Sequence, residues 1–330
     1  MDQNSPRYEA APPWELKLEG SNPDVAAVAV NSRGEVHVLT RSPHPVLVFD
    51  RRGRFLRSWG DGVFATTHGM TIGSDDCVYI VDAEDSTIRK FSPSGEPLLQ
   101  LGTPFTVSET GFRDNDFRTI DRAAPPFNSP TGVAIAPSNE IYISDGYGNA
   151  AVHRFTEHGE LVQTWGGAGR GPGEFRTPHG VFVDGQGIVY VSDRENDRVQ
   201  RFTPDGAYVG EWGEANRPAA VFVASDGTSF VAEMGYIAGL VQGMPEPGRD
   251  TPQSRVTVRD PNGRLLGLVG VPEDPDLSPC APGRFLAAHA VWVDSEGSVY
   301  VTEVINARAK SGPGAVPLTC HAFQVFHRVQ

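Results

Sequence analysis

The stretch that decides the fold is residues 177–193, which read TPHGVFVDGQGIVYVSD. Two short runs of alternating apolar residues flank a turn that contains two glycines, as expected for a pair of antiparallel strands. The chain continues through Arg198–Phe202, the turn Thr203–Gly206 and a further run that ends at Trp212 and Gly213. The segment therefore predicts a unit of four short strands joined by tight turns.

This unit recurs along the whole chain, and internal repeats decide a fold before any single motif does. Its first two strands are repeated without gaps in four other copies, and a weaker copy precedes them. The six copies begin at Ala26, Thr67, Pro130, Thr177, Pro218 and Ala288. Four-stranded units repeated around an axis are typical of β-propellers, so the sequence predicts an all-β fold with six blades.

The last copy has only three strands, the third being Phe323–His327. We expect the apolar stretch Trp14–Leu18 to supply the fourth strand, so that both chain ends close the ring and leave no open sheet edge. This predicts a single propeller domain over residues 14–330, preceded by a flexible segment at 1–13. The pattern of residues 189–202, VYVSDRENDRVQRF, resembles NHL repeats, and this resemblance covers nearly the whole chain and implies the same fold.

Composition favours a turn-rich fold and disfavours several classes of function. The 330 residues include 37 Gly and 27 Pro, which favours many short elements joined by turns. A formal net charge of −13 disfavours binding to the phosphate backbone of nucleic acids. No run of 18 apolar residues is present to span a membrane, and no export signal is recognisable at the N-terminus. We expect a cytoplasmic monomer with no nucleic-acid or membrane partner, although a removed export signal would leave no trace.

Three of the nine histidines share one position of the repeat. The residue at the opening of the innermost strand, called here the axial slot, is Ala26, His68, Thr131, His179, Ala219 and His289 in the six copies. The histidines thus stand in alternate blades, about 120° apart, and converge on the ring axis. Three imidazoles with open positions suit a divalent transition metal such as zinc. The alternative is three unrelated histidines satisfied within the core, which does not explain their shared slot.

The longer loops point to the same face of the ring. In a four-stranded antiparallel blade, the start of strand one and the ends of strands two and four lie on one face, called here the histidine face. All the insertions fall at these points, and long loops crowded on one mouth usually build a pocket. The insertions are Thr103–Phe127, Tyr236–Ser254, Val271–Phe285 and Val304–Ala322. Cys280 and Cys320 lie in the last two, and the sequence leaves open whether they pair.

A second repeat position, at the end of strand two, carries carboxylates in five copies. It holds Thr40, Asp82, Asp145, Asp193, Glu233 and Glu303. We expect these carboxylates to accept backbone N–H groups of the turn between strands two and three. Arg41, Tyr147 and Arg194 follow this position and are therefore predicted on the histidine face, where Arg can hold a carboxylate and Tyr can transfer protons. The alternative for Arg194 is a simple ion pair with Glu195 or Asp197.

The segments around these residues resemble one enzyme family, the peptidyl-α-hydroxyglycine α-amidating lyases. Thr67–Gly69, Pro178–His179 with Val191–Phe202, and His289 are similar to the three metal-ligand segments of that family. Ser144–Asn149 is similar to the segment that carries its active-site tyrosine.

The resemblance implies a lyase that cleaves an N-acyl-α-hydroxyglycine, a small carboxylate-bearing carbinolamide, to an amide and glyoxylate. It implies Zn²⁺ or another divalent metal on the three histidines, with Tyr147, Arg41 and Arg194 in catalytic roles. Three positions depart from the family pattern, because Gly148 replaces a disulfide cysteine, Ala290 replaces a calcium-binding aspartate and Ala287 replaces a methionine. A structural Ca²⁺ is therefore in doubt.

Three functions remain open at this point. The first is the lyase, and the second is a metal-dependent hydrolase or hydratase that uses the same site on another small molecule. The third is a non-enzymatic NHL interaction module. The shared slot of the histidines and the one-sided insertions favour the two enzyme hypotheses.

Overall fold

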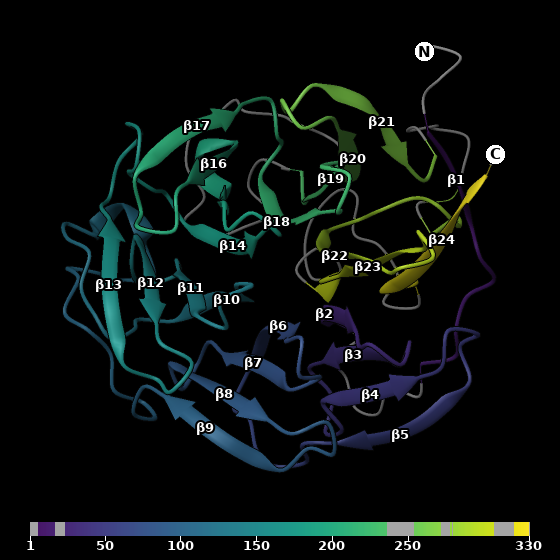
Figure 1. The fold of residues 1–330 in the computed structure, drawn as a ribbon, viewed down its shortest axis with the longest axis horizontal. Coiled ribbons are helices and arrows are strands. Elements are labelled where there is room, and N and C mark those ends of the chain that lie inside the picture. Colours follow the sequence, from purple (N-terminus) through teal and green to yellow (C-terminus); the bar gives the residue numbers. More distant parts are fainter. Residues whose placement is uncertain are drawn as a thin grey trace.

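The structure is a computed structural model that describes residues 6–16, 24–235, 254–271, 278, 280–306 and 320–329. Six four-stranded antiparallel sheets stand around a central axis, as Figure 1 shows in a view down that axis. The predicted six-bladed β-propeller is confirmed. The described residues contain no helix long and apolar enough to cross a membrane.

Each blade takes its strands in chain order from the axis outward, except that the last blade takes its outermost strand from the N-terminus. Blade one consists of β2 (Val25–Val30), β3 (Val36–Thr40), β4 (Val46–Phe49) and β5 (Phe55–Trp59). Blade two consists of β6 (Thr67–Ile72), β7 (Val78–Asp82), β8 (Thr87–Phe91) and β9 (Pro97–Leu101). Blade three consists of β10 (Pro130–Ile135), β11 (Ile141–Asp145), β12 (Ala151–Phe155) and β13 (Leu161–Gly166).

The other three blades repeat this order. Blade four consists of β14 (Pro178–Val183), β15 (Val189–Asp193), β16 (Arg198–Phe202) and β17 (Tyr208–Trp212). Blade five consists of β18 (Pro218–Val223), β19 (Ser229–Glu233), β20 (Arg255–Arg259) and β21 (Leu265–Val269). Blade six consists of β22 (Ala288–Val293), β23 (Val299–Glu303), β24 (Phe323–Val329) and β1 (Arg7–Ala10). Between strands of the described part lie the short 3₁₀ helices η1 (Phe117–Thr119) and η2 (Arg194–Asn196).

Burial explains why these short strands hold together. The second strand of every blade is buried along its whole length, because the neighbouring blades cover both of its faces. Strands covered on both faces carry continuous apolar runs, as in Val189–Val191. The outermost strands, such as β5 and β9, are largely exposed. The core is therefore a set of layers between adjacent blades rather than one central mass.

The strand that closes the ring differs from the expected one. Arg7–Ala10 pairs with β24 in antiparallel register, with Arg7 opposite Val329 and Ala10 opposite Phe326. The assignment of Trp14–Leu18 to this strand is therefore wrong, since Trp14–Leu16 lies outside any strand and residues 17 and 18 fall outside the described part. The closing strand comes from the segment expected to be flexible.

Packing of the tryptophans gives the physical reason. In blade one the outermost strand ends at Trp59, whose indole packs on Gly95 of the next blade. Trp14 packs in the same way on Gly53 of blade one. Trp59 is the last residue of its strand, and a tryptophan in this position therefore follows the body of the outermost strand. The strand of the last blade must therefore precede Trp14.

Candidate metal centre

The three axial histidines open β6, β14 and β22, each as the second residue of its strand. A register shift interrupts the pairing of these strands at the histidine, and β-bulges of this kind re-aim a side chain. One ring nitrogen of each histidine lies within 4.8 Å of the other two, and all three residues are buried. The ring centroids are 4.8 Å apart in every pair. The structure thus brings His68, His179 and His289 together around the axis.

The other three axial-slot residues orient these imidazoles. Nδ1 of His68 lies 2.6 Å from the carbonyl oxygen of Thr131, and Nδ1 of His179 lies 2.9 Å from that of Ala219. Nδ1 of His289 lies 2.7 Å from the carbonyl oxygen of Ala26. Because a carbonyl only accepts, each Nδ1 carries the hydrogen and each Nε2 keeps its lone pair. Metal-binding histidines typically have such a partner, which sets the tautomer and the ring orientation.

The protonation state also fits a metal. Burial is the main cause that lowers the pKa of His289 to about 3 and holds the pKa of His68 and His179 well below the ordinary value of about 6.5. The charge of Arg41 adds to the effect at His289, and that of Arg194 adds to it at His179. All three imidazoles are therefore neutral at physiological pH, which is the form that binds a metal. A buried set of three neutral nitrogen donors fits zinc or another divalent transition metal.

Tyr147 reaches this centre from the turn after β11. Its hydroxyl oxygen lies 2.8 Å from Nε2 of His68 and 3.2 Å from Nε2 of His179. The tyrosine ring stands nearly perpendicular to the His68 ring. Sequence reasoning placed Tyr147 only on the histidine face, whereas the structure places its hydroxyl against two of the three histidines.

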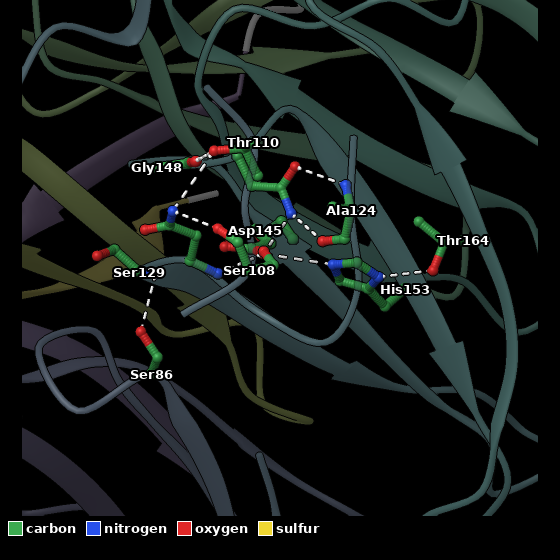
Figure 2. A network of polar contacts seen from close by, with 12 residues as sticks. Ser86, Ser108, Thr110, Ala124, Ser129, Asp145, Gly148, His153 and Thr164 are labelled. Carbon is green, nitrogen blue, oxygen red and sulfur yellow. Dashed lines mark hydrogen bonds and ion pairs between the residues drawn. The ribbon is translucent and has the colours of Figure 1, made fainter. Parts of the chain in front are cut away.

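A network of hydrogen bonds holds the turn that carries Tyr147 (Figure 2). Thr110 Oγ1 donates to the carbonyl oxygen of Gly148 at 2.5 Å, which ties the insertion Thr103–Phe127 to the turn. Gly148 N donates in return to the carbonyl oxygen of Asn128. The amide of Asn128 donates to the carbonyl oxygen of Ser108. Sequence reasoning missed Thr110, because it lies in an insertion with no equivalent in the other blades. It also missed the side-chain role of Asn128, two residues before β10.

Asp145 is the centre of the same network. Its Oδ2 accepts hydrogen bonds from Asn128 N at 2.9 Å and Asn149 Nδ2 at 2.8 Å, and His153 Nε2 lies 3.3 Å away (Figure 2). Nδ1 of His153 lies 2.8 Å from Thr164 Oγ1. The contacts of Asp145 are buried and give it a structural role beside the tyrosine turn.

The carboxylates equivalent to Asp145 follow one rule, which corrects the expectation. Asp82, Asp193, Glu233 and Glu303 accept backbone N–H groups of the loop that enters the innermost strand of the same blade. Among the described residues, the turn after strand two supplies a single backbone N–H, in a long contact from Asp85 N to Asp82, and side-chain amides such as that of Asn196, which donates to Asp193. Antiparallel pairing explains this, because the end of strand two lies beside the start of strand one.

Arg194 opens η2 and is buried beside Tyr147. Its guanidinium carbon lies 5.4 Å from the centroid of the tyrosine ring, and its Nε donates to Glu195 at 2.7 Å. The predicted ion pair with Glu195 therefore exists together with the contact to the tyrosine. Glu195 also accepts from Arg217 at 2.9 Å, and Arg217 Nη1 donates to the carbonyl oxygen of Gly235. Arg217 is a buried cation that sequence reasoning missed. It directly precedes β18, and the residues that precede the innermost strands of the other blades are not basic.

Arg41 lies on the opposite side of the centre. Its Nη1 donates to Asp24 at 2.9 Å, and its Nε lies 3.3 Å from the carbonyl oxygen of Thr67, the residue before His68. The side chain is 21% exposed. The structure thus places all three predicted side chains, Arg41, Tyr147 and Arg194, around the histidines, while their catalytic roles stay a prediction.

A small cavity of about 70 Å³ lies on the axis, lined by the three histidines and other residues of the innermost strands. The residues that line it besides the histidines are Ala26, Ala27, Gly69, Met70, Thr131, Gly132, Val133, Gly180, Val181, Ala219, Ala220 and Ala290. No carboxylate is among these described residues, and calcium prefers carboxylate oxygens. The side chains of this cavity therefore do not fit the calcium that the family resemblance implies.

The histidine face of the last blade carries a disulfide between Cys280 and Cys320, whose Cα atoms are 4.9 Å apart. This answers the question of pairing that the sequence left open. Disulfides persist mainly in oxidising compartments, so the cytoplasmic location stays a prediction. Most residues of the insertions Tyr236–Ser254 and Val304–Ala322, and about half of those in Val271–Phe285, lie outside the described part of the chain.

Comparisons with known proteins agree with the predicted repeat and fold. Residues 127–155 and 175–202 match the NHL repeat. A peptidyl-glycine alpha-amidating monooxygenase B from Xenopus laevis is 29% identical over 278 residues, which cover 81% of this chain and 29% of that protein. A probable peptidyl-alpha-hydroxyglycine alpha-amidating lyase from Caenorhabditis elegans is 28% identical over 159 residues, or 47% of this chain and 42% of that protein.

The chain is an NHL-repeat β-propeller that resembles the amidating lyases. The NHL repeat-containing protein 3 of Mus musculus, whose name states no activity, is 32% identical over 57% of this chain and 54% of its own length. The chain thus spans about a third to a half of the length of these relatives.

Solved structures confirm the architecture of the NHL-repeat propeller. Virginiamycin B lyase from Staphylococcus aureus superposes with a TM-score of 0.58 at 13% identity, covering 97% of this chain and 99% of that one. A gluconolactonase from Xanthomonas campestris superposes with a TM-score of 0.61 at 14% identity, covering 99% and 96%. At these identities the likeness concerns the fold alone.

Proposed function

We propose that this protein is a metal-dependent lyase that cleaves the C–N bond of an N-acyl-α-hydroxyglycine-like carbinolamide to a primary amide and glyoxylate. One observation carries the proposal: the hydroxyl of Tyr147 lies against Nε2 of two histidines in a buried set of three. Support also comes from relatives that are named amidating lyases. A carboxylate-bearing small molecule is the substrate that this site would take.

The reaction requires one proton to move within the substrate. The hydroxyl O–H bond breaks, a C=O bond forms on the same carbon, the C–N bond breaks, and the released amide nitrogen gains a proton. A divalent metal bound to His68, His179 and His289 would supply Lewis acidity that lowers the pKa of the substrate hydroxyl. The hydroxyl oxygen of Tyr147 is placed to accept the proton and to return one to the nitrogen.

The charges around Tyr147 favour an anionic substrate. Arg194 contacts the ring of Tyr147 and forms an ion pair with Glu195, which also pairs with Arg217. Although burial acts in the other direction, the two arginines lower the pKa of Glu195 overall, so the carboxylate stays ionised. A substrate carboxylate would bind beside Arg194, since a planar guanidinium suits a carboxylate. Arg41, whose own charge is offset by Asp24, would bind a polar group from the other side of the axis.

The test combines metal analysis with glyoxylate release from N-acetyl-α-hydroxyglycine. We expect the metal-loaded protein to release glyoxylate and acetamide in equal amounts, and chelation to stop the release. A metal-loaded protein that is inert on this substrate would contradict the lyase and favour a metal-dependent hydrolase or hydratase. A protein that binds no metal would leave the NHL interaction module as the remaining hypothesis.

A further inference from the structure

One position in strand three of each blade faces the end of strand two. Strand pairing places it opposite the residue that lies two before the strand-two carboxylate. This position, called here the facing slot, holds Leu47, Arg89, His153, Gln200, Thr257 and Gln324 in blades one to six. In the five blades that have a carboxylate, the residue in the slot forms a hydrogen bond with it.

Blade three, which carries the tyrosine, differs from its neighbours in the cation beside this carboxylate. Asp82, Asp193 and Glu233 each form an ion pair with an arginine of strand three. Among the described residues, the ion-pair partner of Asp145 is instead His153, and both side chains are fully buried. A buried carboxylate needs such a partner, so the position of Asp145 depends on this histidine.

The imidazole of His153 is itself held on both sides. Nε2 lies 3.3 Å from Asp145 Oδ2, and Nδ1 lies 2.8 Å from Thr164 Oγ1, so that the ring stands between β11 and β13 (Figure 2). Because a carboxylate only accepts, Nε2 carries the hydrogen. The ring of Phe127 packs edge-on against the imidazole, with centroids 5.4 Å apart. His153 therefore presents its N–H to Asp145 in one fixed direction.

Asp145 in turn holds the tyrosine turn from two sides. Its Oδ2 accepts from Asn128 N, which precedes the turn in space, and from Asn149 Nδ2, two residues after Tyr147. The carbonyl oxygen of Asn128 accepts from Gly148 N at 2.9 Å. A Cβ on Gly148 would lie 2.1 Å from Asn128 Oδ1, so the two segments fit closely. A shift of Asp145 would thus move the turn and with it the hydroxyl of Tyr147.

We propose that His153 is a positioning residue for Tyr147. It orients Asp145, and Asp145 fixes the turn that places the tyrosine hydroxyl against the axial histidines. The proposal rests on the proposed lyase function for its turnover readout, whereas the position of the turn can be measured without any substrate.

The facing slot supplies the variants for the test. His153→Leu introduces the leucine of blade one and removes the donor to Asp145. His153→Gln introduces the glutamine of blade four, which donates to its own carboxylate at 3.1 Å. Thr257→Val is the matched control, because it removes a buried hydrogen bond to Glu233 from the same slot in blade five, where no catalytic side chain is predicted.

Glyoxylate release gives the first readout. We expect His153→Leu to lower kcat at least tenfold while KM and metal content change less than threefold, since a displaced proton-transfer group affects turnover more than binding. We expect His153→Gln to restore kcat to within about threefold of the wild type, and Thr257→Val to stay within twofold.

Amide hydrogen exchange gives a second readout that needs neither substrate nor metal. The amides of Tyr147 and Gly148 donate to the carbonyl oxygens of Ser129 and Asn128, so their exchange reports on the turn. We expect both to exchange at least tenfold faster in His153→Leu and at near wild-type rates in His153→Gln and Thr257→Val. The amide of Val191, in β15 of the next blade, should keep its rate in all variants and serves as the internal reference.

Thr164→Val is a milder variant that decides the matter if His153→Leu does not fold. It removes the second partner of the imidazole and keeps the shape of the side chain. We expect kcat to fall about threefold and the exchange of Tyr147 and Gly148 to quicken by a similar factor.

Wild-type turnover and exchange in His153→Leu, or in Thr164→Val where the former does not fold, would overturn the proposal. A loss that His153→Gln does not restore, or faster exchange that includes Val191, would also overturn it, because His153 would then be a core residue without a specific effect on the turn. A wild-type chain that releases no glyoxylate, together with the expected exchange pattern, would contradict the lyase and leave the positioning of the turn by His153 supported.

Discussion

Nδ1 of His289 lies 2.7 Å from the carbonyl oxygen of Ala26, and this contact joins the last blade to the first across 263 residues of sequence. The same bond is repeated between His68 and Thr131 and between His179 and Ala219. The axial slot therefore alternates around the ring between a residue that offers an imidazole and one that orients it. The contact between the last and the first blade therefore also sets the tautomer of the third histidine.

Tyr147→Phe tests the proton-transfer role of the tyrosine. The change removes the hydroxyl next to His68 and His179 but keeps the ring on which Arg194 packs. We expect glyoxylate release to fall about 100- to 10,000-fold, as is usual for loss of a general acid–base group, while metal content stays the same. Tyr208→Phe, an exposed tyrosine, is the control. Full turnover in Tyr147→Phe would remove this residue from the mechanism.

Thr110→Val tests whether the first insertion positions the tyrosine turn. Valine has nearly the same shape as threonine but lacks the hydroxyl that donates to Gly148. We expect turnover to fall about tenfold or more, since a shift of roughly 1 Å at a reacting group can cost about 100-fold. Thr110→Ser keeps the hydroxyl and should restore most of the turnover. Equal activity in the valine and serine variants would show that this hydrogen bond does not position Tyr147.

Glu195→Gln tests the buried charge cluster. The change leaves Arg194 and Arg217 buried without their shared counterion, and breaking a buried ion pair in this way costs about 3–5 kcal/mol. We expect the free energy of unfolding, measured with guanidinium chloride, to fall by that amount. Glu160→Gln, on the exposed surface, should change it by less than about 0.5 kcal/mol. A loss below about 1 kcal/mol in Glu195→Gln would contradict the account of this cluster.

His37 predicts a pH dependence of stability. The side chain is buried in β3, neither ring nitrogen has a hydrogen-bond partner among the described residues, and burial lowers its pKa to about 4, with a further contribution from the charge of Arg57. A histidine with a lowered pKa stabilises the fold above its unfolded value of about 6.5, and this stability is lost as the pH falls toward 4.

His37→Leu removes both this dependence and the unpaired nitrogens. We expect the stability advantage of the variant over the wild type to grow by about 2 kcal/mol between pH 7 and pH 5. His158→Leu, which replaces an exposed histidine, is the control. Parallel pH profiles of His37→Leu and the wild type would show that His37 does not contribute.

The repeat explains which features could be predicted from the sequence. Positions with six copies can be aligned, so the six blades, the axial histidines and the face that carries Arg41, Tyr147 and Arg194 follow from the register alone. The closing strand could not be placed in this way, because the last blade has no fourth strand in chain order. Arg7–Ala10 is recognised as that strand only when Trp14 is matched to Trp59 at the end of β5.

Contacts made by residues without a repeat equivalent could not be predicted from the sequence either. Thr110 lies in an insertion, and Arg217 reaches Glu195 of the neighbouring blade through a side chain that has no basic equivalent. The carboxylates of strand two were recognised as acceptors, but their donors depend on which loop lies beside the strand end. Such donors are set by three-dimensional pairing rather than by distance along the sequence.

Metal content of the purified chain tests the central claim most directly. We predict about one equivalent of a divalent transition metal per chain in the wild type and in His158→Ala, and loss of that metal in His179→Ala. A wild-type chain that binds no such metal, or a His179→Ala variant that binds it equally well and is equally stable, would contradict the metal centre and with it the proposed lyase.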